Sequence, residues 1–182
     1  MAAESYKRQD LIIRKAGEDD LPALVDFQVK LALHVAGPPA QKLKKKERKR
    51  LLEILSAALL DKDKLLVVAE LPDAGLVGMA YLYIWRSQGI WEQAGDHVFK
   101  SGIIDDIWVE PDFRKLGIFS AMLKQLIAFA EQRDVPELIL EYAISNKEAD
   151  ATWKRLGFEV TGVRAAAFTS LVKAKLNAGR TA

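Results

Sequence analysis

The chain has 182 residues, half of them hydrophobic, which suits one domain with a full core. Its 27 basic and 25 acidic residues leave a net charge of +2, which argues against a nucleic-acid-binding or membrane-surface protein. The absence of cysteine excludes disulfides, thiolate metal sites and a cysteine nucleophile. The polar start MAAESYKRQD and the lack of an apolar run near ~18 residues predict a soluble, cytoplasmic protein.

The first half of the chain is typical of a strand, two helices and a hairpin. β-branched and apolar runs predict strands at 11–15, 65–71 and 76–85, the last two joined by the turn PDAG. Apolar residues at helical spacing predict helices over 21–36 and about 41–60. The residues that follow, 86–99, are expected to form a loop with partial structure.

The second half alternates strands and helices. The predicted elements are a strand at 102–109, a helix at 117–133, a strand at 137–144, a helix at 146–156 and two strand-like stretches around Val160 and Leu171. Helices between strands favour an α/β sheet with mixed pairing. We expect one domain over 1–182, with short flexible ends at about 1–8 and 177–182.

The stretch from Val109 to Leu123 (VEPDFRKLGIFSAML) predicts a strand, a basic turn and a helix. Backbone N–H groups at a helix start bind anions, and Gly117 allows a phosphate to approach closely. Arg114 and Lys115 add positive charge. Turns of this kind also occur in proteins with no ligand, so these residues alone leave both interpretations open.

The wider pattern resembles a known family. The motif Val109-x-Pro111-x-Phe113-Arg114-x-x-Gly117-Ile118 is similar to the acetyl-CoA-binding motif of the GNAT acetyltransferases. The blocks Asn146-x-x-Ala149 and Trp153-Lys154-Arg155-Leu156-Gly157-Phe158 resemble its second motif. The resemblance covers nearly the whole chain. It implies the GNAT acyl-CoA N-acyltransferase fold, a mixed twisted sheet of about six to seven strands flanked by about four helices.

The resemblance also implies a cosubstrate, acetyl-CoA, and the residues that bind it. The turn would present backbone N–H groups to the pyrophosphate, the preceding strand would pair with the pantetheine arm, and the next helix would contact that arm. The residues in these positions are Ile107, Val109, Arg114, Lys115, Leu116, Gly117, Ile118, Phe119, Asn146 and Trp153. No metal site is expected.

Two residues depart from the family pattern. Phe119 replaces a small residue, and its ring either points into the core with Leu123, Leu126 and Ala130 or crowds the pyrophosphate. Trp153 replaces a tyrosine that often protonates the departing CoA sulfur, and an indole N–H cannot act as an acid near neutral pH. A thiolate with a pKa near ~8.5 can leave without that proton, so activity is expected to survive.

Acetyl transfer needs a neutral amine, so a carboxylate or a water chain must accept a proton. Asp105, Glu141 and Tyr142 are the catalytic candidates. Regular alternation places Asp105 with Ile107 and Val109, and Asp106 with Ile104 and Trp108, on opposite faces. A β-bulge, common near active sites, would change that assignment. A surface or capping role remains an alternative for each acid.

Several other features have plain structural explanations. Ser145 and Glu148 have the spacing of a helix capping box. His34 and His97 lack partners at metal-ligand spacing, although His97 stays an outside candidate for the base. The basic run at 42–52 fits a solvated helix face, or else a surface for acidic partners or CoA phosphates. Within the loop, Trp91, Glu92 and Asp96 would suit a cationic amine.

The sequence therefore predicts an N-acetyltransferase that transfers the acetyl group of acetyl-CoA directly to an amine in a ternary complex. The alternative is a non-catalytic acyl-CoA-binding or regulatory module on the same fold. The expected partner is a small-molecule or peptide amine, with no nucleic acid and no membrane, and a homodimer is possible for families of this kind. The acceptor itself stays open.

Overall fold

The computed structural model describes residues 10–36, 44–86, 100–163 and 165–178. The chain divides into two compact units, 1–143 and 144–182, and each is described by itself. The first unit contains β1 (Ile12–Lys15), η2 (Glu18–Asp20), α1 (Leu21–Ala36), α2 (Lys45–Leu60), β2 (Lys64–Leu71), β3 (Gly75–Arg86), β4 (Lys100–Val109), η3 (Pro111–Phe113), α4 (Ile118–Glu131) and β5 (Glu137–Leu140). The second contains α5 (Lys147–Arg155) and α6 (Thr169–Ala178).

The described strands form one mixed sheet in the order β1-β2-β3-β4-β5. The first three pairings are antiparallel, and β4 pairs with β5 in parallel through residues 101–104 and 137–140. The hairpin and the parallel pair confirm the predicted α/β class. The strand at 137–144 is shorter than predicted, because its partner strand continues without it beyond Ile104.

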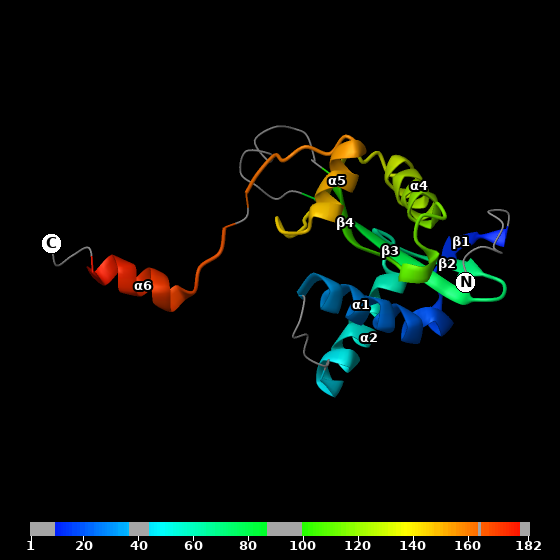
Figure 1. Cartoon of the computed structure of the whole chain (residues 1–182), viewed down its shortest axis with the longest axis horizontal. Helices are drawn as coiled ribbons and strands as arrows, with labels where there is room; N and C mark the ends of the chain where they lie inside the picture. The colour runs from blue at the N-terminus through cyan, green and yellow to red at the C-terminus, as the bar shows by residue number, and fades with distance from the viewer. Residues whose placement is uncertain (1–9, 37–43, 87–99, 164, 179–182) are drawn as a thin grey trace. The chain divides into compact units, whose positions relative to one another are not determined.

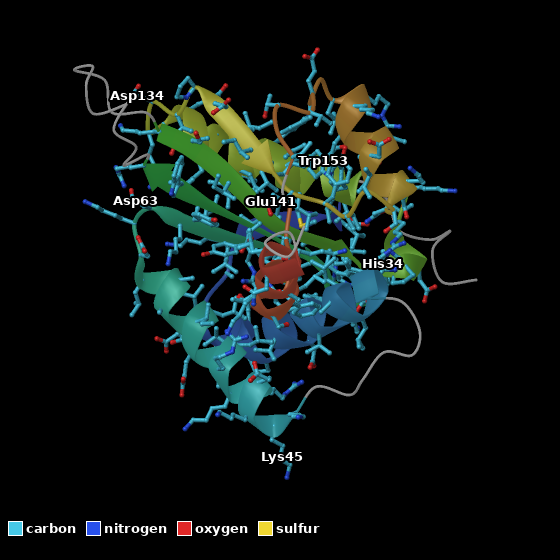
Figure 2. The ribbon with its side chains drawn as sticks, turned by 90° about the vertical axis from the view of Figure 1, so that its left-hand side faces the viewer. His34, Lys45, Asp63, Asp134, Glu141 and Trp153 are labelled. Carbon is cyan, nitrogen blue, oxygen red and sulfur yellow. The ribbon has the colours of Figure 1, made fainter. Side chains whose placement is uncertain are left out.

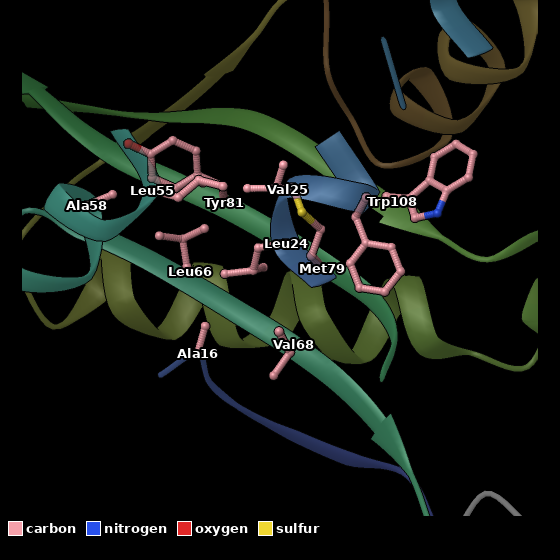
Figure 3. Packing of buried hydrophobic residues seen from close by; sticks show 11 residues of the cluster. Ala16, Leu24, Val25, Leu55, Ala58, Leu66, Val68, Met79, Tyr81 and Trp108 are labelled. Carbon is pink, nitrogen blue, oxygen red and sulfur yellow. The ribbon is translucent and has the colours of Figure 1, made fainter. Parts of the chain in front are cut away.

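Helices cover both faces of this sheet (Figure 1). On one face, α1 and α2 pack on β2, β3 and β4, and the buried cluster there is lined by Leu24, Leu55, Met79, Tyr81 and Trp108, among others (Figure 3). On the opposite face, α4 packs against β2, β3 and β4. Because side chains alternate along a strand, each β4 residue faces either the α1–α2 layer or α4.

Gly78 lies on β3 where the backbone of β4 and a side chain of α4 both come close. A Cβ atom at this position would lie 2.8 Å from the carbonyl oxygen of Trp108 and 3.4 Å from Cε of Met122. The backbone carbonyl cannot move without disturbing the ladder. We expect Gly78→Ala to lower the free energy of unfolding by about 2 kcal/mol, the usual cost of overpacking.

The measurement is the urea midpoint of each variant, with Gly17→Ala as the control. A Cβ at Gly17 would meet its nearest atom, Oδ2 of Asp20, at 4.0 Å, and the backbone there is extended. That variant should stay within about 0.5 kcal/mol of the wild type. Equal midpoints for the two variants would show that the contact at Gly78 is relieved at no cost.

The second unit is built around α5, whose N-terminal cap differs from the sequence prediction and whose C-terminal end lies at Gly157, as predicted. Asn146 is the N-cap, and its Oδ1 accepts a hydrogen bond from the Ala149 N–H at 3.1 Å. The predicted capping box starting at Ser145 is therefore wrong by one residue. At the other end, the left-handed Gly157 and the bond from the Phe158 N–H to the Trp153 carbonyl complete a Schellman turn.

The C-terminal strands are the main error of the sequence prediction. No strand occurs in the described residues after Leu140, and α6 occupies the stretch around Leu171. The sheet therefore has five strands among the described residues rather than six to seven, and five α-helices accompany it. Alanine, leucine and lysine in TSLVKAKLNA are strong helix formers, which explains α6. Within the described ranges, every helix is too short or too polar to cross a bilayer.

Candidate active site

A β-bulge interrupts β4 at Asp105. Tyr81 lies opposite Asp106 in the β3–β4 ladder, but the next residue, Leu82, lies opposite Ile104, so Asp105 is the extra residue. Opposed residues share a face, which places Asp106 on the α1–α2 side with Tyr81. The prediction from regular alternation that Asp106 shares a face with Ile104 is therefore wrong, whereas Trp108 does share the face of Asp106, as predicted. The bulge that the sequence analysis left as an alternative is present.

The same point is where β4 and β5 separate. Their pairing ends at Ile104 and Leu140, and among the described residues no strand pairs with this edge of β4 farther on. The Glu110 N–H donates to the Val77 carbonyl at 2.9 Å on the β3 side. Antiparallel ladders alternate, so the backbone groups of Ile107 and Val109 point toward the open edge.

The turn after β4 joins this open edge to α4. Lys115 and Gly117 both have left-handed backbone angles, with φ of 64° and 85°. The first intrahelical bond of α4 runs from the Ala121 N–H to the Gly117 carbonyl, so the N–H groups of Leu116 and Ile118 precede the helix's own ladder. An anion placed there would meet several N–H groups and the positive end of the helix dipole.

The side chain of Arg114 connects the turn before α4 to the end of β4. Its Nε donates to the Val109 carbonyl at 3.2 Å, and its guanidinium carbon lies 5.3 Å from the centroid of the Trp108 ring. This bond occupies one lone pair of the Val109 carbonyl. Among the described residues, the N–H of Val109 and both backbone groups of Ile107 remain for a ligand along the edge.

Phe119 lies on the buried side of α4. Leu123, Leu126 and Ala130, which share its side of the helix, are all buried, and Phe119 itself is half-buried. This geometry agrees with the interpretation that its ring turns toward the core. The effect of Phe119 on cofactor binding remains a prediction.

Two adjacent carboxylates mark the bulge. Asp105 reaches solvent, but the surrounding protein removes part of its hydration, and this desolvation raises its pKa, with smaller contributions from Asp106 and Glu141. Burial also raises the pKa of Asp106, partly offset by a 2.6 Å hydrogen bond from Nε2 of Gln28 on α1. A raised pKa makes a carboxylate a better proton acceptor near neutral pH.

Tyr81 and Tyr83 stand beside these carboxylates on the α1–α2 face of β3. Their ring centroids are 6.0 Å apart. Desolvation, followed by the charge of Asp105, raises the pKa of Tyr81 to about 12 and also raises that of Tyr83. Both hydroxyls therefore stay protonated. The bulge is lined by the carboxyl groups of the two aspartates and by the phenol groups of the two tyrosines.

The other catalytic candidates lie just past β5 rather than within it. Glu141 follows the last strand residue and is exposed (Figure 2). Its charge raises the pKa values of Asp105 and Tyr83, which places Glu141 in the electrostatic range of the bulge. Tyr142 is half-buried next to it. The structure thus brings Asp105 and Glu141 into one electrostatic neighbourhood.

Sequence reasoning missed Gln28 and the two tyrosines. Gln28 lies four residues after Leu24 and three before Leu31, inside the apolar stripe of α1, and a polar residue there signals a buried partner. The tyrosines alternate in the stretch AYLYIW, which puts both rings on one face of a strand.

The remaining site predictions fall in the second unit or outside the described residues. Asn146 caps α5, and Trp153 on the same helix is buried with its ring 5.1 Å from that of Phe158. Their contacts with a cofactor stay predictions. The loop candidates Trp91, Glu92, Asp96 and His97 lie outside the described residues.

Half of the six described basic residues in the run at the start of α2 form ion pairs with acids. Arg48 bonds to Asp26 on α1 at 2.5 Å, and Arg50 bonds to Glu47 within α2 at 2.8 Å. These residues are exposed, so the solvated-face interpretation agrees with the structure. The first residues of the run, 42 and 43, lie outside the described part of the chain.

Comparison with known proteins gives a family match over most of the chain. The model of the acetyltransferase (GNAT) family matches residues 32–158. A [ribosomal protein bS18]-alanine N-acetyltransferase of Escherichia coli K12 is 36% identical over 67 residues, which are 37% of this chain and 45% of that protein. An uncharacterized N-acetyltransferase of Methanocaldococcus jannaschii is 41% identical over 56 residues, 31% of this chain and 25% of that one. The matches span less than half the length of these relatives.

Solved structures share the fold. A predicted acetyltransferase from Clostridium acetobutylicum, solved with acetyl-CoA, has a TM-score of 0.70 at 20% identity, over 87% of this chain and 96% of that one. An aminoglycoside 6'-N-acetyltransferase from Acinetobacter baumannii has a TM-score of 0.62 at 20% identity, over 87% and 97%. At this identity the likeness concerns the fold alone.

Proposed function

The chain belongs to the acetyltransferase (GNAT) family and is an acyltransferase, and we propose that it transfers the acetyl group of acetyl-CoA directly to an amine. The observation that carries this proposal is the continuous path from the bulge at Asp105, along the open edge of β4, to the left-handed turn at Gly117. A proton acceptor stands at one end of that path, and N–H groups suited to a pyrophosphate stand at the other.

The residues present fit acetyl-CoA as a cosubstrate. The edge at Ile107 and Val109 offers backbone groups for an amide-bearing arm, and the turn at 114–119 offers N–H groups for phosphates. When bound, acetyl-CoA supplies an activated thioester, whose acetyl group passes to the amine nitrogen while CoA leaves with its sulfur. The chain's own residues bind, orient and manage the proton.

Asp105 is the proposed proton acceptor. An amine with a pKa of ~10.4 is almost wholly protonated at pH 7 and must lose a proton before its lone pair is available. Asp105 reaches solvent, and its pKa is raised by desolvation, so it can take that proton, directly or through a water, and pass it on. Glu141 and Tyr142 are the further candidates. With Trp153 in place of a tyrosine, the CoA sulfur is proposed to leave as a thiolate.

The acceptor does not carry over from the relatives. The Escherichia coli relative acts on an alanine of a ribosomal protein, whereas the Acinetobacter neighbour acts on an aminoglycoside. The chain covers under half of the first protein and shares only the fold with the second. Peptide and small-molecule amines therefore both stay within the proposal.

Calorimetric titration with acetyl-CoA tests the proposal, with Phe119→Ala measured in parallel. We expect the wild type to bind, and Phe119→Ala to change the dissociation constant by less than about threefold, since the half-buried ring lies on the core side of α4. Binding gained only in Phe119→Ala would mean that the ring closes the turn.

Release of free CoA with an amine panel then separates the enzyme from the alternative. Turnover with any amine supports the acetyltransferase. Binding of acetyl-CoA with no turnover across the panel would favour the non-catalytic module, and absence of binding in both proteins would contradict a cofactor site at this turn.

A further inference from the structure

The side chain of Trp108 holds a buried hydrogen-bond donor that has no acceptor. Trp108 lies on β4 opposite Met79 and is 6% exposed. Among the buried side-chain nitrogen and oxygen atoms of the described residues, Nε1 of Trp108 is the one without a hydrogen-bond partner. An indole N–H can only donate, and a buried donor without an acceptor costs stability. Native proteins rarely keep such a group, so this one calls for an explanation.

The indole lies close to the proposed proton acceptor. It belongs to the buried cluster beneath α1 and α2, and Figure 3 shows its ring at the border of that cluster, next to Met79. It shares the face of Asp106 and follows Ile104, where the pairing of β4 with β5 ends. Two residues on one face of a strand are roughly 7 Å apart along it. The free N–H is therefore a neighbour of the bulge, beside the open edge of β4.

A positive charge and an imidazole ring accompany this N–H. The guanidinium carbon of Arg114 lies 5.3 Å from the centroid of the Trp108 ring. The Nε atom of Arg114 donates to the Val109 carbonyl, but its two terminal nitrogens bond to no group in the described part of the chain. The ring of His34, on α1, meets the indole at 5.8 Å between centroids and 70° between planes. An oxygen with full or partial negative charge would complete these groups.

Side chains that can move lie beside the indole. His34 is exposed, and Arg114 is half-buried. Such side chains change rotamer within nanoseconds, whereas a shift of the β4 backbone would disturb its ladder with β3. A ligand oxygen can therefore reach Nε1 of Trp108 when one side chain turns aside.

Resting on the proposed function, we infer that the acceptor is an α-amine whose neighbouring carbonyl or carboxylate oxygen accepts a hydrogen bond from Nε1 of Trp108. The amine lies at Asp105, and the oxygen lies beside Trp108 and Arg114. With a hydrogen bond of about 3 Å at each end, the spacing leaves room for only a short connection between nitrogen and oxygen. An amino acid or the first residue of a peptide has that connection, whereas an alkylamine or a polyamine lacks the oxygen.

The distribution of charge along β4 agrees with such a ligand. Carboxyl groups stand at the bulge, in Asp105 and Asp106, and the guanidinium of Arg114 stands at the other end, beside the indole. An ammonium is attracted to the first end and a carboxylate or carbonyl oxygen to the second. A ligand with both groups is favoured over one that carries positive charge alone.

Glycine, glycinamide and isobutylamine test the inference, because they share one arrangement of non-hydrogen atoms. Glycine carries a carboxylate beside the amine-bearing carbon, glycinamide carries an amide carbonyl there, and isobutylamine carries only methyl groups. We expect kcat/KM for glycine or glycinamide to exceed that for isobutylamine by about three- to tenfold, as for one hydrogen bond. Preference for glycine would indicate a free amino acid, and preference for glycinamide the end of a peptide.

Two variants separate the N–H from other differences between the amines. An adjacent oxygen also changes the basicity of an amine, so the change of the ratio between proteins decides. Trp108→Phe keeps an aromatic ring without the N–H and should lower the ratio of the better oxygen-bearing amine to isobutylamine by about three- to tenfold. Met79→Leu alters the buried side chain opposite Trp108 and should leave the ratio unchanged. A ratio that Trp108→Phe does not lower, or that both variants lower equally, would overturn the inference.

A measurement on the wild type does not depend on how well Trp108→Phe folds. The chain has four tryptophans, hence four indole N–H signals in a proton–nitrogen correlation spectrum. Trp85→Phe, Trp91→Phe and Trp153→Phe assign the other three. With CoA present, glycine or glycinamide should move the Trp108 proton signal downfield, as a new hydrogen bond does, and isobutylamine should not. A signal unmoved by all three compounds would mean that the protein itself satisfies this N–H, through the face of the His34 ring, and would overturn the inference.

The same spectrum separates this inference from the proposed function. A Trp108 signal that responds to glycine or glycinamide, while no amine releases CoA from acetyl-CoA, would keep the binding site and contradict the acetyl transfer. Release of CoA, with a Trp108 signal that responds equally to the three compounds, would keep the transferase and overturn the site.

Discussion

Asp105→Asn is expected to lower kcat/KM for acetyl transfer by about 10²- to 10⁴-fold, the usual contribution of a positioned general base. The side chain keeps its size at the bulge, but an amide cannot accept the amine proton. CoA release with a reactive amine measures the loss. Acetyl-CoA binding should be nearly unchanged, because the proposed contacts with the cofactor come from the backbone of β4 and from the turn at Gly117.

The pH dependence of kcat/KM is a second measurement on Asp105→Asn. In the wild type, kcat/KM should fall on the acid side as Asp105 takes up a proton, at a pH above the ordinary carboxyl range, since its pKa is raised. Asp105→Asn should lose that limb. Asp73→Asn, which removes an exposed charge in the β2–β3 turn, is the charge control and should keep it.

Asp105→Asn should lower the activity without lowering the free energy of unfolding. The folded state raises the pKa of Asp105, so the protonated carboxyl group contributes stability that is fully present below the ordinary pKa and is lost as pH rises through the folded value and the carboxylate forms. Asp105→Asn should therefore be at least as stable as the wild type at pH 7 by urea unfolding. A variant that is both inactive and unstable would point to a structural role instead.

The fold was predictable from the sequence wherever local pattern and long-range pairing agree. The strand–turn–helix around Gly117 came from residue type alone, since only glycine takes its left-handed angle at no steric cost. The ends of β5 were not predictable, because ELILEYAI reads as one strand until its partner diverges at the bulge. For α6, helix propensity prevailed over a strand-like pattern.

The residues of the candidate site were largely predictable from the sequence, but the face of the sheet on which each residue lies was not. Sequence alternation cannot show a bulge, and one extra residue at Asp105 separates Asp106 from Ile104 across the sheet. Gln28 is 78 residues away from Asp106, so that bond depends on how α1 packs on β4. The position of α1 therefore helps to determine the geometry of the site. The buried carboxylate of Asp20 lies directly before the start of α1.

Asp20→Ala is expected to lower the free energy of unfolding by about 3 kcal/mol. Asp20 is 6% exposed, at the end of the 3₁₀ turn that leads into α1. Its carboxylate accepts bonds from Nη1 and Nη2 of Arg14 at 2.6 and 2.9 Å and from the Gly17 N–H at 2.8 Å. Alanine removes all three, although Arg14 stays partly hydrated, which limits the loss.

The control for this substitution is Glu70→Gln, which alters the bond from Nε of the same Arg14 at its more exposed side. An exposed ion pair contributes little, so we expect Glu70→Gln to lower the free energy of unfolding by under about 1 kcal/mol.

The hydrogen bonds from Arg14 lower the pKa of Asp20, so its contribution to stability is present above the ordinary carboxyl pKa and is lost as pH falls. The gap between wild type and Asp20→Ala should thus be full at pH 7 and narrow below about pH 4. Urea unfolding at both pH values measures it. A constant gap would mean that packing, not charge, holds the start of α1 and, through Gln28, the position of Asp106.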